Sequence, residues 1–139
     1  MPPETKKLML SPLSPAAPGA LYQQIVDGIR REVSEGRLRP GDTLPSFRML
    51  AEDLLVSLIT VKRAYEELER EGIIYRRQGL GTFVADRGLD RSREAKLNTS
   101  QKLFRDAARE AVEAGLSRPE ILKLAQTLIE ENDYEQPRH

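Results

Sequence analysis

Hydrophobic residues at helical spacing mark the first predicted element of the chain. In the segment LYQQIVDGIRREVSEG, apolar side chains recur at every fourth position: Leu21, Ile25, Ile29 and Val33. This spacing places them on one face of an α-helix. Gly36 fits the position that follows a helix, and RPGD at 39–42 is typical of a tight turn. The pattern therefore predicts an amphipathic helix that begins near Leu21 and ends at Gly36.

Two further helical patterns follow, separated by about three residues. Ser46 can cap a short helix over 47–54, and Ser57 can cap a longer helix that ends at Gly72. The buried face of the short helix is expected to hold Met49, Leu50 and Leu54. That of the longer helix has 3, 4, 7 spacing: Val61, Ala64, Tyr65 and Leu68. Because the connection is so short, the two helices must meet at a sharp angle, as in a helix-turn-helix.

After Gly72 the pattern changes from helix to strand. IIYRR and TFVA are rich in β-branched and aromatic residues, and QGLG between them supplies a glycine-containing loop. These segments predict a β-hairpin. The order of helix, helix-turn-helix and hairpin predicts a winged helix-turn-helix over residues 20–87, in a chain that is mainly α with a small β-hairpin.

The remaining residues, 88–139, are expected to form a short two-helix dimerisation tail. The first helix starts at about Arg91 and is closed by Gly115, and SRPE is a capping box that starts the second. Two helices of this length cannot bury both apolar stripes alone, so we expect them to pack on a second copy. The alternative is that the tail packs only on its own winged domain. The expected dimerisation residues are Leu97, Phe104, Ala108, Ala111, Val112, Ile121, Leu124, Ala125 and Leu128.

The first 19 residues contain five prolines: Pro2, Pro3, Pro12, Pro15 and Pro18. Proline removes backbone donors and disfavours regular helix. We expect residues 1–19 to form a flexible or extended arm.

Composition excludes several classes of function. The 139 residues include no cysteine, and the one histidine is His139, which argues against thiolate chemistry, a histidine metal site or a catalytic triad within one chain. No phosphate loop and no paired carboxylates are present, so an enzyme is remote, and we expect no metal and no cofactor. No apolar run approaches the roughly 20 residues that span a bilayer, and no signal peptide is visible. We therefore expect a cytoplasmic protein without a membrane partner.

Charge is polarised along the chain although the net charge is zero. From Glu110 to Glu135 there are seven acidic and two basic residues. The middle holds cationic pairs: Arg37 and Arg39, Lys62 and Arg63, Arg76 and Arg77. The winged domain can thus face phosphates while the tail cannot.

The start of the longer helix carries an unusual surface. Leu58 and Ile59 fall off its predicted buried face, and Lys62 and Arg63 follow. The first turn of a recognition helix reads base edges in the major groove, where these aliphatic side chains can contact thymine methyl groups. Thr60 can bond a base or a phosphate. The alternative is that Leu58 and Ile59 are core residues and that the two cations form a solvated face.

Three motifs make the chain resemble a known family: GRLRPGDTLPSFRMLA, TVKRAYEELEREG and RRQGLGTFV. From about Leu21 to Ala85 it resembles, without a gap, the winged-helix domain of the GntR family of bacterial transcription regulators. The short tail is similar to that of the YtrA-like subfamily. The resemblance implies a homodimer on a two-fold symmetric double-stranded DNA operator. Together with the cations at the helix and the wing, the expected DNA-contacting residues are Arg48, Ser57, Leu58, Ile59, Thr60, Lys62, Arg63, Arg77, Gln78, Gly79, Leu80 and Gly81.

Four positions depart from the family pattern. Leu58 stands where a cation is frequent, and Phe47 where an acidic residue is common. Leu55 occupies the place of a turn glycine, and Leu80 replaces a frequently basic wing residue. The operator is therefore not predictable from relatives.

The expected function is that of a sequence-specific transcriptional regulator, a repressor of an adjacent transporter-type operon as the resemblance implies. The alternative is a winged-helix module that binds protein without specific DNA binding, using Leu58 and Ile59 as an apolar hot spot. A steep salt dependence of DNA binding separates the two. The sequence shows no effector pocket, so a small-molecule effector, if the protein has one, would have to act by shifting the angle between two winged domains.

Overall fold

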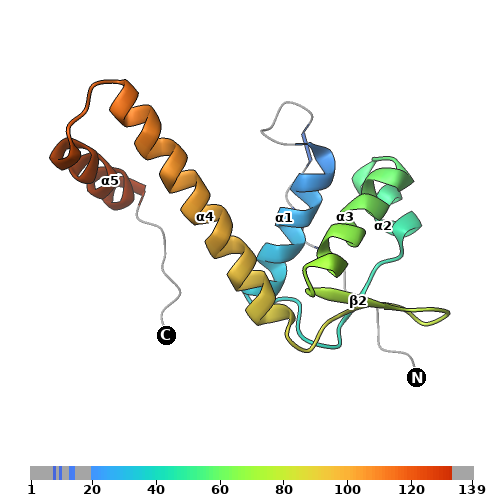
Figure 1. The fold of residues 1–139 in the computed structure, drawn as a ribbon. Coiled ribbons are helices and arrows are strands. Elements are labelled where there is room, and N and C mark those ends of the chain that lie inside the picture. The colour runs from blue at the N-terminus through green and yellow to red at the C-terminus, as the bar shows by residue number, and fades with distance from the viewer. Residues whose placement is uncertain (1–7, 9, 11–12, 15–19, 133–139) are drawn as a thin grey trace. The chain divides into compact units, whose positions relative to one another are not determined.

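The computed structural model describes residues 8, 10, 13–14 and 20–132 (Figure 1). The elements are α1 (Leu21–Ser34), β1 (Thr43–Leu44), α2 (Phe47–Leu54), α3 (Leu58–Arg70), β2 (Ile74–Arg77), β3 (Gly81–Val84), α4 (Gly88–Glu113) and α5 (Arg118–Asn132). The chain divides into two compact units, Met1–Leu97 and Asn98–His139, with the division inside α4. The mainly helical winged helix-turn-helix expected from the sequence is confirmed.

The core of the first unit lies between α1, α2, α3 and the small sheet. The predicted stripe of α1 is confirmed at Ile25, Ile29 and Val33, which are fully buried, whereas Leu21 at the helix start is partly buried. The stripe of α3 is confirmed as well, with Val61, Ala64, Tyr65 and Leu68 almost completely inaccessible. Full burial of an aliphatic side chain stabilises a domain by about 1.5–3 kcal/mol. These two stripes therefore supply much of the free energy that holds the unit together.

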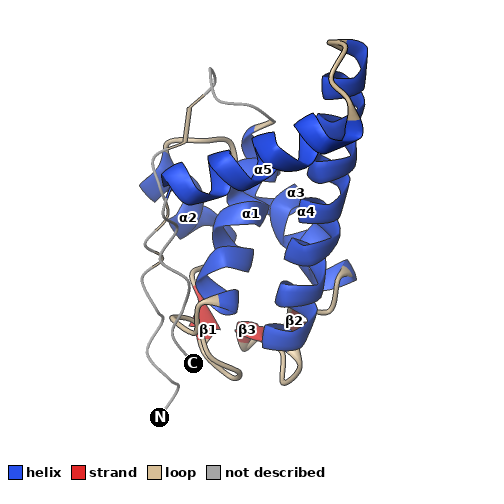
Figure 2. Ribbon diagram, turned by 90° about the vertical axis from the view of Figure 1, so that its left-hand side faces the viewer, coloured by secondary structure: helices blue, strands red, loops and turns tan. Residues whose placement is uncertain are grey.

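The hairpin belongs to a three-stranded antiparallel sheet of order β1-β3-β2 (Figure 2). Ile74 pairs with Val84 and Arg77 pairs with Gly81, as a hairpin closed by Gln78–Leu80 requires. The third strand, β1, was not predicted. It has two residues, and Thr43 pairs with Phe83. A strand of that length is too short to show the alternation by which strands are recognised.

The predicted caps fix where α2 and α3 begin. The Ser46 hydroxyl accepts a hydrogen bond from the Met49 amide at 3.1 Å, and the Ser57 hydroxyl accepts one from the Thr60 amide at 3.1 Å.

Between the helices, Leu55 adopts the left-handed conformation with φ of 56° and is 92% exposed. This is the place where the family often has glycine, which adopts this conformation without a steric penalty.

Tyr65 holds the beginning of α2 against α3. Its hydroxyl donates a hydrogen bond to the carbonyl of Pro45 at 2.8 Å, and its ring lies 5.1 Å from that of Phe47 in an edge-to-face contact. Burial raises the pKa of Tyr65 because the phenolate would lose its hydration. The side chain thus ties the two helices of the helix-turn-helix together from within the core.

The buried face of α2 differs from the prediction at one residue. Leu50 and Ala51 are buried and Leu54 is partly buried, whereas Met49 is 51% exposed. Residues 50, 51 and 54 share one helical face, and Met49 lies about 100° away from Leu50. The buried residues of α2 are Leu50 and Ala51, and Met49 lies on the opposite side of the helix from Ala51. The prediction was therefore wrong for Met49.

Part of the segment expected to be a flexible or extended arm packs on the domain. Leu8, Leu10 and Leu13 lie against the core, and the side-chain amide of Gln24 bonds both the N–H and the carbonyl of Ser14. At Gly28 a Cβ would lie 2.7 Å from the Leu10 side chain, so the glycine lets that leucine approach α1 closely. The expectation of a flexible or extended arm did not include these contacts. The rest of 1–19 lies outside the described residues.

The start of α4 is anchored to the first unit. The buried Ser92 hydroxyl donates to the carbonyl of Arg30 on α1 at 2.6 Å. The Arg30 guanidinium forms ion pairs with Asp27 and with Glu71, the C-cap of α3. At Gly88 a Cβ would lie 2.8 Å from the Ile73 carbonyl oxygen, which explains the glycine at this close approach. The helix begins at Gly88, three residues before the predicted Arg91.

The second unit consists of the remainder of α4 and of α5, joined at Gly115. The predicted capping box is confirmed, since the Ser117 amide donates to the Glu120 carboxylate at 2.9 Å and the Glu120 amide donates to the Ser117 hydroxyl at 3.4 Å. The hydrogen bonds from Ser117 lower the pKa of Glu120.

None of the described helices is long and apolar enough to cross a membrane.

Replacing Leu55 by glycine should stabilise the protein. The left-handed conformation costs a leucine about 1–2 kcal/mol, and the flexibility of glycine in the unfolded chain returns about half of that gain. We expect Leu55→Gly to raise the free energy of unfolding by about 0.5–1 kcal/mol in urea titrations. Leu80→Gly is the matched control, because Leu80 is also exposed but does not have positive φ. Equal destabilisation by both substitutions would contradict the prediction.

Replacing Tyr65 by phenylalanine should lower stability by about 1–3 kcal/mol, because the buried Pro45 carbonyl loses its donor. The folded pKa of Tyr65 lies above the unfolded value of about 10. The contribution of the neutral phenol is therefore complete below pH 10 and is lost as pH rises further. Urea titrations at several pH values should show a smaller loss of stability above pH 10 in Tyr65→Phe than in the unchanged protein. Tyr75→Phe, which removes a phenol from the exposed side of the hairpin, should keep the full loss.

Candidate nucleic-acid interface

The first turn of α3 exposes two aliphatic side chains. Leu58 is 45% exposed and Ile59 is 78% exposed, although both lie in a helix whose opposite face is fully buried. The alternative in which these residues belong to the core is therefore wrong. Ile59 lies about 160° around the helix from Val61, so helical geometry directs it away from the core. Leu58 lies on the side of Tyr65 and is exposed because the buried stripe begins one turn later, at Val61.

The two hydroxyls of the same turn are bonded to each other. The Ser57 and Thr60 side-chain oxygens lie 2.7 Å apart, and the Ser57 oxygen also accepts the Thr60 amide. Both side chains are thus held in the cap of α3. If either hydroxyl turned towards a base, it would weaken the hydrogen bonds that cap α3.

Cations flank the apolar pair. Arg48 in the first turn of α2 and Lys62 in α3 are exposed, and neither forms an ion pair within the described part of the chain. Arg63 differs, because its guanidinium lies 3.8 Å from the centre of the Tyr22 ring on α1 in a cation–π contact. The structure therefore holds Arg63 against α1, while Arg48 and Lys62 remain available to an anion.

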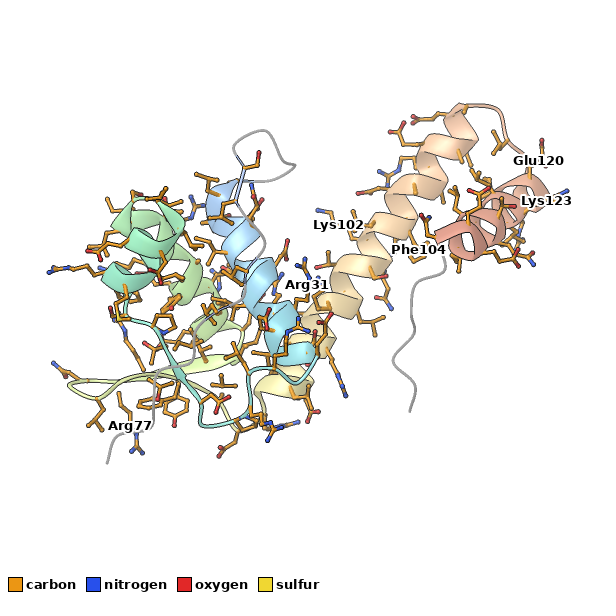
Figure 3. All side chains as sticks on the ribbon, turned by 180° about the vertical axis from the view of Figure 1, so that it is seen from behind. Arg31, Arg77, Lys102, Phe104, Glu120 and Lys123 are labelled. Carbon is orange, nitrogen blue, oxygen red and sulfur yellow. The ribbon has the colours of Figure 1, made fainter. Side chains whose placement is uncertain are left out.

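The hairpin tip presents the remaining predicted residues. Arg77, labelled in Figure 3, ends β2, and its carbonyl accepts the Leu80 amide at 3.0 Å to close the turn. Gly79 has φ of 79°, as a tight hairpin turn requires, and Leu80 is 68% exposed. All residues from Arg77 to Gly81 are exposed. The tip thus has a cation and a protruding leucine.

A groove of about 710 Å³ connects the hairpin with the start of α2. Its walls include the predicted tip residues Arg77–Gly81 together with residues that the sequence did not single out as a site: Thr43, Leu44, Ser46, Phe47, Met49, Arg76 and Thr82. Arg76 lies 4.3 Å from the centre of the Phe47 ring. The RR dipeptide was a visible cationic signal, but the stacking on Phe47 depends on contacts far apart in sequence. The groove does not include Arg48 or the residues of α3.

The tail leaves most of its apolar side chains uncovered. Of the predicted dimerisation residues, five are exposed and four are partly buried in the single chain; the exposed ones are Leu97, Phe104, Val112, Leu124 and Leu128, and the partly buried ones are Ala108, Ala111, Ile121 and Ala125. No residue of α5 is buried. The prediction missed three exposed aliphatics, which fall outside its stripes: Leu103, Leu122 and Ile129. Among the described residues, no group of three acidic, histidine or cysteine side chains could hold a metal.

The chain is similar in sequence to known transcription regulators. Residues 21–84 match the family described as bacterial regulatory proteins, gntR family. The chain is 33% identical over 104 residues to the HTH-type transcriptional repressor YtrA of Bacillus subtilis (strain 168), covering 75% of this chain and 80% of that protein. It is 34% identical over 110 residues to the uncharacterized HTH-type transcriptional regulator YhcF of the same organism, covering 79% and 90%.

A solved structure agrees in fold as well as in sequence. The GntR family transcriptional regulator from Listeria monocytogenes matches with a TM-score of 0.67 and 30% identity, covering 79% of this chain and 96% of that chain. The family and these relatives are transcription regulators, which are not enzymes. The chain belongs to the GntR family of bacterial regulatory proteins and is a DNA-binding transcriptional regulator.

Proposed function

We propose that the protein represses an adjacent, transporter-type operon by binding a palindromic operator as a homodimer. The observation that carries this proposal is the first turn of α3, where Leu58 and Ile59 are exposed beside Arg48 and Lys62, two cations that form no ion pair among the described residues. The relative named as a transcriptional repressor, YtrA, supports repression as the outcome of binding.

The recognition helix is α3, with its first turn in the major groove. A helix fits this groove, and residues at its N-terminal turn reach the base edges. Arg48 and Lys62 then serve the phosphates on either side, and the N-terminal end of α3 adds its own partial positive charge. The hairpin tip, Arg77–Gly81, lies at the neighbouring minor groove.

The homodimer is formed by the tail. Exposed apolar side chains on α4 and α5 are unfavourable in water, and a second copy offers the same apolar surface in two-fold symmetry. Such a dimer places two recognition helices about one DNA turn apart, or a small multiple of it, so that each reads one half-site. The acidic surface of the tail faces away from DNA.

The first test is a binding measurement. Fluorescence anisotropy of the purified protein on the DNA upstream of its own gene, against a scrambled fragment, should show a preference of about a thousandfold at physiological salt. Equal binding to both fragments would mean that the adjacent operon is not its target. No binding to either fragment at low salt would contradict the proposal and favour a protein-binding role.

Arg48→Ala should weaken binding to all DNA sequences alike. Each lost phosphate contact flattens the plot of log affinity against log salt by about one unit. We therefore expect a shallower slope and an unchanged preference for the operator over scrambled DNA, measured by anisotropy from low to physiological salt. Arg31→Ala is the control, because Arg31 is an exposed arginine of α1 (Figure 3). An equal effect of both substitutions would show that Arg48 acts through net charge alone.

Phe104→Asp should separate the dimer. Phe104 is 58% exposed and lies on the α5 side of α4, where a charge would have to be buried in the dimer (Figure 3). Sedimentation should show monomers at concentrations where the unchanged protein is dimeric, and affinity for the palindrome should fall towards that for a half-site. Lys102→Asp places the same charge on the opposite side of α4 and should leave the dimer intact. Persistence of the dimer in Phe104→Asp would overturn this assignment.

A further inference from the structure

We infer that the first turn of α3 reads the 5-methyl groups of thymine in each half-site through Leu58 and Ile59, by apolar contact instead of hydrogen bonds. This inference rests on the proposed function, because it requires α3 to enter the major groove. It adds to that function the chemical group that the protein selects.

The first support is the shortage of free polar groups in this turn. The hydroxyls of Ser57 and Thr60 are bonded to each other at 2.7 Å, and the Ser57 oxygen also caps the helix. Arg63, whose planar fork of donors suits guanine, is stacked on the Tyr22 ring. Ser57 and Thr60 are held by the cap, and Arg63 is held on Tyr22, so a hydrogen bond from the Arg63 N–H donors to a base either keeps that contact with Tyr22 or breaks it at a cost.

The second support is the exposure of the aliphatic pair itself. Leu58 and Ile59 are exposed at the helix start while the opposite face of α3 is closed by the core. Both side chains consist of methyl and methylene groups alone, so their gain on binding comes from removing apolar surface from water. They point to an apolar counterpart on the partner.

The third support is the charge around the pair, which identifies the partner as DNA. Arg48 and Lys62 are exposed and unpaired within the described residues, so phosphates can approach on either side of Leu58 and Ile59. Between the phosphates, the C5-methyl of thymine is the apolar group that the major groove displays. Lys62 remains free to bond a phosphate or a guanine, so the inference concerns the first turn.

The methyl group can be removed without changing base pairing. Uracil pairs with adenine as thymine does and lacks only the 5-methyl. Burial of one such group contributes about 0.8 kcal/mol, so each contacted thymine should weaken binding about fourfold when replaced by uracil. The operator is first selected from a random duplex pool with the full chain, and each thymine is then replaced in turn while anisotropy measures the affinity at physiological salt.

Matched variants show which side chain contacts the methyl. In Ile59→Ala or Leu58→Ala, uracil at the contacted position should have little further effect, because the partner of the methyl has gone. Leu80→Ala also removes an exposed leucine, but from the hairpin tip, and should keep the full fourfold loss. At the same position, 5-methylcytosine should bind more tightly than cytosine, which separates the methyl group from the thymine base.

The outcomes separate the inference from the proposed function. A specific operator whose affinity is unchanged by uracil at every position would overturn the inference and leave the proposed function standing. The same holds if the loss on uracil substitution persists in both Leu58→Ala and Ile59→Ala, because the methyl would then act through DNA shape. If selection recovers no specific sequence, the proposed function fails and the inference fails with it.

Discussion

The burial of one face of α3 is the constraint on which the rest of the structure depends. Val61, Ala64 and Leu68 are inaccessible because α3 packs along α1 and over the sheet. A helix with a fully buried face must direct the residues about 100° to either side, and those opposite, towards solvent. The same packing that stabilises the domain therefore presents Ile59 and Lys62 at the surface, and Leu58 is exposed because the buried stripe begins one turn later, at Val61. The packing that forms the core thus also exposes the candidate DNA-contacting residues of α3.

Stability around this helix is provided by contacts that are distant in sequence. Tyr65 reaches the Pro45 carbonyl and the Phe47 ring, so that the start of α2 is held to the middle of α3. Arg30 on α1 pairs with Glu71 at the end of α3, and its carbonyl receives Ser92 from α4. The start of α4 is thus bonded to the same α1 that packs on α3. These contacts hold residues 88–92 of α4 within the first unit.

Two of the four departures from the family pattern, Leu58 and Leu80, fall on the surface that we propose to meet DNA. Leu58 and Leu80 are apolar where the family often has cations, and both are exposed. Leu55 is exposed in a strained conformation that glycine would relieve. Because these side chains are exposed, a different residue at these positions changes no contact in the core. They change the chemistry that the domain offers to a base edge, which is how one scaffold can serve different operators.

Local patterns determined much of this protein. The stripes of α1 and α3 follow from residues three and four apart, and the caps at Ser46, Ser57 and Ser117 follow from serines placed just before an apolar run. Such features depend on neighbours within a few residues, and so sequence can express them. The exposure of Ile59 was likewise contained in the spacing of the stripe, whereas Leu58 lies on the face of Tyr65 and is exposed because the buried stripe begins only at Val61.

Other features were decided by tertiary structure alone. Three of these features are contacts between residues that are distant in sequence: the pairing of β1 with β3, the packing of Leu10 against Gly28 and the stacking of Arg63 on Tyr22. The exposure of Met49 depends likewise on how α2 packs on its neighbours. No periodicity encodes them, because the choice among possible partners depends on where the helices lie. The sequence thus determined the elements and the caps of the helices, whereas the fold decided that Arg63 lies on the Tyr22 ring of α1 while Arg48 and Lys62 stay exposed, because only the packed core brings α1 and α3 together.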